Sequence, residues 1–258
     1  LEQRRVLIGR WHRENGFTDN PNDHEVVRRV MRGIRRKFGK KQKQAKPAPL
    51  RVIEKIVSHL DAASTAIAYP DERQNRAAHL QASRDKAMIL TSFWFGLRSD
   101  ELISLRVCDV SFHLDAEVPY LELYLIKSKT DREGQGSTRK LEALPGLCPM
   151  TAIREWLDVC SHGVQPMDRR RDENPLFVKV SRWGSLSDSP IHRNSINKLL
   201  KSLFEEAGID PEDYSSHSMR RGIANWIIDS GASITELTEW IGWRDTRTAM
   251  RYLDGKSS

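Results

Sequence analysis

Residues 216–253 read SHSMRRGIANWIIDSGASITELTEWIGWRDTRTAMRYL, and this stretch predicts three consecutive helices. Ser216 is suited to cap the first helix, and Gly231 is suited to end it. Ser233 and Glu236 form a capping box at the start of the second helix. A glycine then ends the second helix, and a third follows. The C-terminal part of the chain is therefore expected to be helical.

Four side chains in this stretch can take part in chemistry. His217 and Arg220 lie three residues apart on one predicted helix, so their side chains point the same way. Trp243 follows the second helix, and Asp245 can cap a last helix that carries Tyr252. A lone histidine, tryptophan or tyrosine on a helix is more often a packing residue. A chemical role is therefore indicated only by the four residues together.

The rest of the chain is also mainly helical by its apolar periodicity. Gly96 is expected to stop a long helix, and a short helix follows Ser99. A polar loop that contains glycine separates two predicted strands, as in a hairpin. The expected helices cover two segments within residues 1–38, then 50–63, 71–95, 151–160 and 193–207, and the expected strands cover 120–126, 139–144 and 176–180.

Three charged residues belong to these upstream elements. Arg98 follows the end of the long helix, and alone it would be read as part of a surface ion pair. Glu101 lies in the first turn of the next helix, where an acid suits the helix dipole. Lys129 lies in the loop of the hairpin, where neighbouring Lys127 is a rival and the sequence SKT favours Lys129.

Positive charge is concentrated at the start of the chain. The whole protein of 258 residues has a net charge of +7, but residues 1–50 hold 14 basic and 5 acidic residues. The densest stripe, Arg28 to Lys46, contains no acidic residue. A stripe with one sign of charge predicts a polyanionic partner, and nucleic acid is favoured over a membrane surface. The predicted DNA-binding residues within the stripe are Arg28, Arg29, Arg32, Arg35, Arg36, Lys37, Lys40 and Lys41.

The domain organisation follows from the segment 39–49, GKKQKQAKPAP, which is basic, rich in proline and almost without apolar residues. We interpret it as a linker. The two helices before it are too short to bury a core alone. The chain does not begin with Met, and we expect residues 1–45 to be the end of a helical domain and residues 46–258 to form a second domain.

Other classes of protein fit the sequence poorly. No apolar run approaches the roughly 18 residues of a membrane-spanning helix, and no signal peptide is recognisable. Cys108, Cys148 and Cys160 lie far apart, which argues against a disulfide framework or a zinc site and suits a reducing cytoplasm. Neither a nucleotide-binding glycine motif nor a metalloprotease motif is present. We therefore expect no metal and no cofactor.

Taken in order, the motifs resemble the tyrosine recombinase (phage integrase) family. They are GLRSDELISLRVCDV around Arg98, IKSKT around Lys129, SHSMRRG around His217 and Arg220, and IGWRDTRTAMRYL around Tyr252. The resemblance implies a mainly α catalytic domain with a small antiparallel sheet, preceded by the end of a core-binding domain.

The resemblance also implies a catalytic set of Arg98, Lys129, His217, Arg220, Trp243 and Tyr252, with Glu101 in support. Two features depart from the family pattern. The family more often has histidine at the position of Trp243. Only six residues follow Tyr252, whereas in the family a C-terminal segment often docks on a neighbouring protomer, so the sequence leaves open whether such docking occurs or the chain is trimmed.

The chemistry of this set can be argued from the side chains. The phenol of Tyr252 can attack a DNA phosphate and form a phosphotyrosine. Arg98 and Arg220 can bind the non-bridging oxygens, and Lys129 can protonate the departing 5′ oxygen. His217 can take the tyrosine proton or contact the phosphate, and Trp243 can donate its indole N–H. No step needs a metal or ATP.

We therefore expect a site-specific recombinase or integrase of a mobile genetic element. Its expected partners are double-stranded DNA, three further copies in a homotetramer on two DNA sites, and accessory DNA-bending proteins, in the nucleoid of a bacterial cytoplasm. The alternatives are a type IB topoisomerase, which shares this chemistry, a DNA-binding regulator that does not cut, and a general nucleic-acid-binding helical protein.

Overall fold

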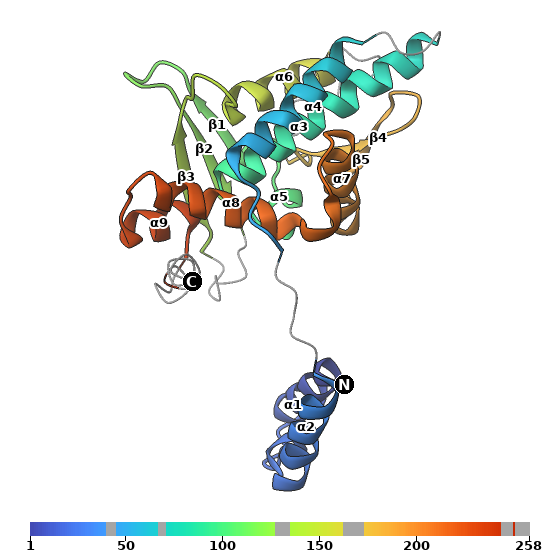
Figure 1. Cartoon of the computed structure of the whole chain (residues 1–258), viewed down its shortest axis with the longest axis vertical. Helices are drawn as coiled ribbons and strands as arrows, with labels where there is room; N and C mark the ends of the chain where they lie inside the picture. Colours follow the sequence, from blue (N-terminus) through green and yellow to red (C-terminus); the bar gives the residue numbers. More distant parts are fainter. Residues whose placement is uncertain (40–44, 67–70, 127–134, 162–172, 244–249, 251–258) are drawn as a thin grey trace. The chain divides into compact units, whose positions relative to one another are not determined.

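The computed structural model describes residues 1–39, 45–66, 71–126, 135–161, 173–243 and Met250. The chain divides into two compact units, Leu1–Gln44 and Ala45–Ser258 (Figure 1). In the described ranges no helix is both long and apolar enough to cross a membrane.

The first unit is a pair of helices. It consists of α1 (Glu2–Glu14), the short 3-10 helix η1 (Pro21–Asp23) and α2 (Glu25–Phe38). Two asparagines of the connection hold it against α1, because Asn20 donates to the Gly9 carbonyl at 3.1 Å and Asn22 to the Arg5 carbonyl at 2.7 Å. Gly9 has no room for a side chain, since a Cβ there would lie 2.1 Å from the Asn22 amide.

The apolar side chains of α2 are less buried than their spacing suggests. Met31 is buried, but Val30 and Phe38 are 54% and 69% exposed. Two helices offer each other only one narrow contact face, so they cannot cover a full apolar stripe. The first unit therefore exposes apolar as well as basic surface.

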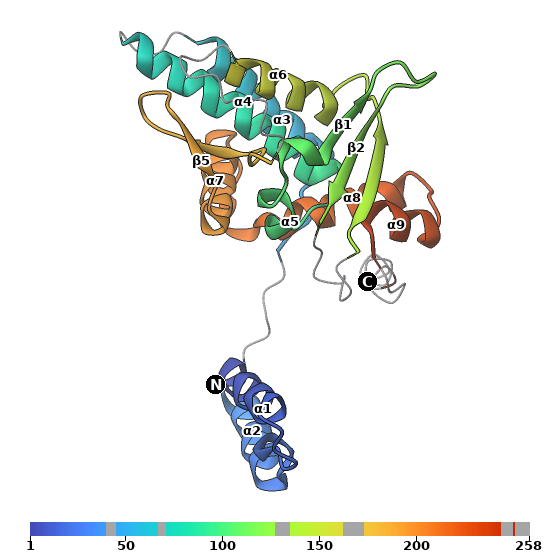
Figure 2. The same ribbon diagram turned by 180° about the vertical axis from the view of Figure 1, so that it is seen from behind.

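The second unit is mainly helical, with two small antiparallel sheets, which confirms the predicted fold class (Figures 1 and 2). Its helices are α3 (Leu50–Thr65), α4 (Glu72–Trp94), α5 (Ser99–Ile103), α6 (Pro149–Ser161), α7 (Arg193–Glu206), α8 (Ser216–Asp229) and α9 (Ile234–Ile241), with 3-10 turns η2 (Val107–Asp109) and η3 (Pro211–Asp213). Its strands are β1 (Val110–His113), β2 (Tyr120–Leu125), β3 (Ser137–Glu142), β4 (Val178–Val180) and β5 (Leu186–Pro190).

Helix α4 is the centre of this unit. It lies between α3 and α6 in both views, and it also contacts α8 (Figures 1 and 2). Its C-terminal half is buried on all sides, and Phe93 is completely inaccessible. Trp156 of α6 is equally buried and donates its indole N–H to the Leu176 carbonyl at 2.8 Å. This core fixes the end of α4, where the candidate site begins.

The larger sheet has the strand order β1-β2-β3, with both pairs antiparallel. Alternate residues of β2 are buried, among them Leu121 and Leu123. The buried positions of β3 are Leu141, opposite Leu121, and Arg139, opposite Leu123. An arginine thus occupies a position of the sheet where a strand normally carries an apolar side chain.

The start of the second unit is fixed to α8. The Ala48 N–H donates to the Ser218 carbonyl at 2.9 Å, and Arg221 donates to the Ala45 carbonyl at 2.8 Å. Gly222 makes the close approach possible, since a Cβ there would lie only 2.0 Å from the Ala48 carbonyl oxygen. The glycine of the SHSMRRG motif is therefore required by packing.

Most predicted helices and strands are found with small shifts at their ends, but two details differ. The strands β1 and β5 were not expected, because both are short and β5 is largely exposed and polar. Ser215, not Ser216, caps α8, since its Oγ accepts the His217 N–H at 3.3 Å. The predicted last helix from Asp245 lies outside the described residues.

Candidate active site

The turn between α4 and α5 places Arg98 at the edge of the core. α4 ends at Trp94, and Gly96 adopts a φ of +56°, a left-handed conformation that favours glycine. Leu97 is buried, and Arg98 is the N-cap residue of α5 with its side chain 23% exposed. The turn therefore holds the backbone in the core while the guanidinium reaches the surface.

Glu101 fixes Arg98 by two hydrogen bonds. Its Oε2 accepts the Arg98 backbone N–H at 2.8 Å, and its Oε1 accepts from Arg98 Nη1 at 2.7 Å. The carboxylate is only 2% exposed, and Arg220 Nη1 lies 3.8 Å from it. Burial by itself raises the pKa of Glu101, but the Arg98 N–H and the charges of Arg98, Arg220 and Arg139 lower the pKa below its usual value. Glu101 is therefore a carboxylate anion at neutral pH.

Arg220 joins α8 to both of the other site segments. It is 5% exposed, and it donates to the Gly96 carbonyl at 2.5 Å and to the Ile241 carbonyl at 3.2 Å. These bonds connect the turn before Arg98 with the end of α9. Arg98 and Arg220 thus share the Glu101 carboxylate, and this is the arrangement that a pair of phosphate-binding arginines needs.

Trp243 follows α9 and packs against Arg220. Gly242 caps the helix with a φ of +65°, and the Trp243 side chain is buried beyond it. The Arg220 Cζ lies 5.5 Å from the centroid of the Trp243 ring, within the range of a cation–π contact. One role of Trp243 is therefore to support the Arg220 guanidinium.

His217 lies one turn before Arg220 in α8. Its side chain is exposed, whereas Met219 and Arg220 are buried. The structure brings Arg98, Glu101, Arg220 and Trp243 together, and His217 lies on the same helix as Arg220. Lys129 and Tyr252 lie outside the described residues.

Arg139 is the charged residue of this cluster that the sequence prediction missed. It is 7% exposed, and its charge contributes to the low pKa of Glu101. The signal was present in the sequence, because residues 139 and 141 lie on one face of the predicted strand. An arginine two residues before a leucine on the inward face of a strand indicates a buried charged side chain.

The basic stripe of the first unit is partly neutralised within that unit. Arg28 pairs with Asp23 and Arg29 with Glu25, each at 3.0 Å, and Arg35 pairs with Glu2. The other predicted DNA-binding residues of α2 are exposed, namely Arg32, Arg36 and Lys37. Lys40 and Lys41 are outside the described residues.

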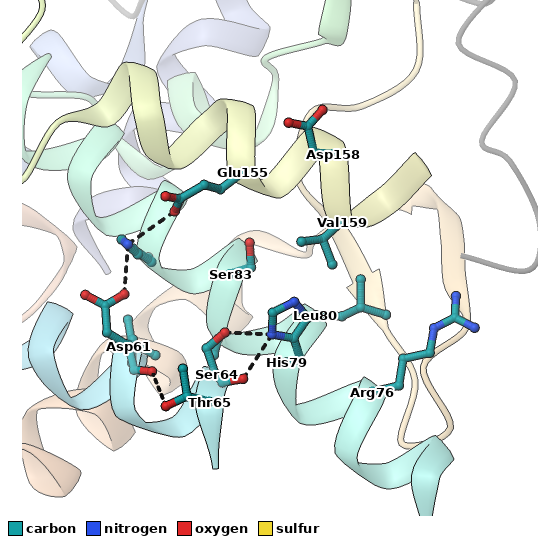
Figure 3. A pocket seen from close by; sticks show the side chains of 13 residues that line it. Asp61, Ser64, Thr65, Arg76, His79, Leu80, Ser83, Glu155, Asp158 and Val159 are labelled. Carbon is teal, nitrogen blue, oxygen red and sulfur yellow. Dashed lines mark hydrogen bonds and ion pairs between the residues drawn. The ribbon is translucent and has the colours of Figure 1, made fainter. Parts of the chain in front are cut away.

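Two further observations concern possible ligands. No group of three or more His, Cys, Asp or Glu side chains in the described ranges is arranged to hold a metal ion. A cavity of about 880 Å³ lies between α3, α4 and α6 (Figure 3). None of the described catalytic candidates lines it, and several of its polar groups pair with one another, as Ser64 Oγ does with His79 Nδ1 at 2.7 Å.

The comparisons with known proteins agree with this geometry. Residues 71–257 match the model of the phage integrase family. The integrase/recombinase xerD homolog of Selenomonas ruminantium is 25% identical over 98% of this chain and 67% of its own length. Tyrosine recombinase XerC of Bifidobacterium longum subsp. infantis is 26% identical over 73% of this chain and 48% of its own length.

Solved structures show the same fold. The XerH site-specific recombinase bound to difH substrate, in a pre-cleavage complex, aligns with a TM-score of 0.56 at 18% identity over 85% of this chain and 54% of that chain. The Tn1549 transposon integrase in complex with circular intermediate DNA aligns with a TM-score of 0.57 at 17% identity over 97% of this chain and 73% of that chain.

The chain spans between about half and two thirds of the length of these sequence relatives. The family match covers the described residues Arg98, Glu101, His217, Arg220 and Trp243. Because this match covers more than half of the chain, the chain belongs to the phage integrase family, the tyrosine recombinases.

Proposed function

We propose that this protein is a site-specific DNA recombinase that cleaves and rejoins strands through a 3′-phosphotyrosine, without metal or ATP. The observation that carries the proposal is the shared Glu101 carboxylate, which holds Arg98 by two hydrogen bonds and lies 3.8 Å from Arg220. Two guanidinium groups fixed in this way are suited to the non-bridging oxygens of one phosphate.

Cleavage would follow from this clamp. The Tyr252 phenol attacks the phosphorus, the P–O bond to the 5′ oxygen breaks, and the phosphate stays covalently bound to the enzyme. Charge on the non-bridging oxygens grows in the transition state, where Arg98 and Arg220 stabilise it most. Lys129 donates a proton to the departing 5′ oxygen, and His217 accepts the proton of the phenol.

Rejoining reverses these steps. A free 5′ hydroxyl attacks the phosphotyrosine, and the phenol leaves with the proton that it had lost. The energy of the phosphodiester is kept in the covalent intermediate, so no nucleotide is consumed. Attack by a strand from another duplex gives recombination, and attack by the original strand restores the substrate.

The assembly belongs to the same proposal. The first unit acts as the end of a core-binding domain, and its exposed Arg32, Arg36 and Lys37 contact DNA phosphates. Four protomers assemble on two DNA sites of a mobile element in the bacterial nucleoid. Accessory proteins that bend DNA assist this assembly. The neighbours bound to difH substrate and to circular intermediate DNA support a duplex DNA substrate.

A nicked suicide substrate tests the chemistry. The protein is mixed with a library of nicked duplexes from the host's candidate attachment sites, with EDTA and without nucleotide. We expect a covalent protein–DNA band on denaturing gels that is lost in Tyr252→Phe. Tyr214→Phe is the control and should retain the band, because Tyr214 directly precedes the cap of α8 and is not one of the proposed catalytic residues. A band that persists in Tyr252→Phe would identify another nucleophile.

Two other outcomes separate the alternatives. Relaxation of supercoiled DNA of any sequence by the protein would indicate a topoisomerase. Specific binding at a mapped site without any band would indicate a DNA-binding regulator that does not cut.

A further inference from the structure

Arg139 has an unusual environment for a charged side chain. It is on the buried face of β3, opposite Leu123 and two residues before Leu141, and only 7% of it is exposed. Taking a charge out of water is unfavourable by several kcal/mol unless partners compensate. The burial of Arg139 therefore needs an explanation other than hydrophobic packing.

The contacts of Arg139 reach two other segments of the site. Nη1 donates to the Phe95 carbonyl at 2.5 Å, in the turn before Arg98. A Cβ built on Gly242 would lie 2.8 Å from Nη2, so the guanidinium lies directly against the cap of α9. Nε is buried and has no hydrogen-bond partner in the described part of the chain.

Arg139 and Arg220 bind the same two segments at adjacent points. Arg139 binds the carbonyl of Phe95, and Arg220 binds that of Gly96. At α9, Arg220 binds the carbonyl of Ile241, and Arg139 contacts the next residue, Gly242. The two guanidinium groups thus fix the relation between the turn and α9, one from β3 and the other from α8.

The electrostatics are consistent with this arrangement. Burial lowers the pKa of Arg139, the Glu101 carboxylate raises it, and the neighbouring positive charge of Arg98 lowers it further. The Glu101 carboxylate therefore compensates part of the unfavourable burial, and Arg139 belongs to the same charge cluster as the phosphate clamp.

The two arginines of the clamp have anchors of their own. Glu101 holds Arg98 by two hydrogen bonds, and the carbonyls of Gly96 and Ile241 hold Arg220. Lys129 lies between β2 and β3 in the sequence, ten residues before Arg139. The hydrogen bond from Arg139 to the turn before Arg98 therefore connects β3, which follows Lys129 in the sequence, with the proposed phosphate-binding pair Arg98 and Arg220.

We infer that Arg139 is a positioning residue for strand cleavage: it ties β3, and with it the hairpin that carries Lys129, to the turn before Arg98 and to the cap of α9. The inference rests on the proposed function. Because the proposed function assigns proton donation to Lys129, which lies between β2 and β3 in the sequence, we expect loss of the link to act on that step. The step that suffers is protonation of the departing 5′ oxygen.

A sulfur substitution at the leaving group isolates that step. In a duplex with a 5′-bridging phosphorothiolate at the mapped cleavage site, the leaving group is a thiolate, which departs without a proton because thiols are far more acidic than alcohols. Wild-type protein, Arg139→Lys and Arg139→Gln are compared on this duplex and on ordinary DNA. Gln keeps an N–H donor and removes the buried charge, so it guards against a failure of Lys to fold.

We expect both variants to bind DNA normally and to cleave ordinary DNA roughly 10–100-fold more slowly than wild type. On the sulfur-containing duplex their cleavage rates should lie within about threefold of the wild-type rate, a difference of the size that ordinary surface substitutions produce. Lys140→Gln is the matched control, because Lys140 is the next residue on β3, is exposed, and pairs with Glu122 on the outer face. It should cleave both duplexes like wild type.

The outcomes distinguish this inference from the proposed function. Lys129→Ala should be slow on ordinary DNA and rescued by sulfur, which verifies the assay. Equal slowing of a folded Arg139 variant on both duplexes, or no slowing at all, would overturn the inference while the recombinase activity stands. Absence of any adduct with the wild-type protein would instead contradict the proposed function.

Discussion

Glu101 receives two hydrogen bonds from a single residue, Arg98, one from its backbone N–H and one from its side chain. The first bond fixes where α5 starts, and the second fixes where the guanidinium points. One buried carboxylate therefore couples the local fold to the orientation of the guanidinium that we propose binds phosphate.

Replacing Glu101 by glutamine should separate these two functions. Gln keeps an acceptor for the Arg98 N–H but removes the negative charge between Arg98 and Arg220. We expect the fold to be retained and strand cleavage to slow by roughly 10–100-fold, since the two guanidinium groups then repel each other and lose their alignment. Single-turnover cleavage and thermal unfolding measure the two effects, with Glu122→Gln as a surface control. Wild-type cleavage by Glu101→Gln would contradict the assigned role.

Gly242→Ala should destabilise the second unit more than Gly231→Ala does. Both glycines have a left-handed φ, +65° and +83°, so alanine is strained at either position by about 1 kcal/mol. At Gly242 the new Cβ would also lie 2.8 Å from Arg139, whereas nothing lies within 4 Å at Gly231. We expect a further loss of about 1–2 kcal/mol at Gly242. Chemical denaturation of the two variants gives the difference, and equal losses would show that Arg139 gives way easily.

Asp85 should make the protein more stable at pH 5 than at pH 7. It is buried in α4, where burial raises its pKa to about 6 although Arg84 binds it at 2.8 Å and opposes the shift. A carboxyl whose pKa is raised on folding holds its proton in the folded state between its unfolded pKa and about 6. Stability is therefore lost as the pH rises through that window.

The corresponding variant is Asp85→Asn, which keeps an oxygen for Arg84 and cannot titrate. We expect the change in unfolding free energy between pH 5 and pH 7 to differ from that of wild type by about 1–2 kcal/mol. Asp188→Asn, on β5 near the surface, is the control. The same pH dependence in wild type and Asp85→Asn would exclude Asp85 as its source.

The exposed cations of α2 should control the salt dependence of DNA binding. Replacing Arg32 and Arg36 together by glutamine is expected to lower the slope of log affinity against log salt by about 2, one unit for each lost phosphate contact. Arg10→Gln is the control, because Arg10 is on α1 and pairs with Glu14 at 2.6 Å. An unchanged slope in the double variant would place the phosphate contacts elsewhere.

Local sequence signals predicted much of the fold. Gly231 and Gly242 mark helix ends because few other residues adopt their backbone conformation, and the capping box of Ser233 and Glu236 is present with both of its hydrogen bonds. The cap of α8 was assigned to Ser216 instead of Ser215, since two adjacent serines give the same local signal. Only the folded backbone shows which oxygen reaches the N–H of His217.

The features that were missed depend on distant partners. β1 and β5 are recognised by the strands with which they pair, because segments of four and five residues are too short to give a clear signal alone. Arg139 is buried by its position in the sheet and compensated by Glu101, which lies 38 residues earlier in the chain. The contact between Glu101 and Arg98, by contrast, is local, because the two residues are three positions apart.

The attachment of residues 45–48 to α8 has a mechanical consequence. Ala45 and Ala48 are hydrogen-bonded to the helix that carries His217 and Arg220, and Gly222 allows the chain to lie against it. Among the described residues, a change at positions 45–48 therefore reaches Arg220 through a single helix.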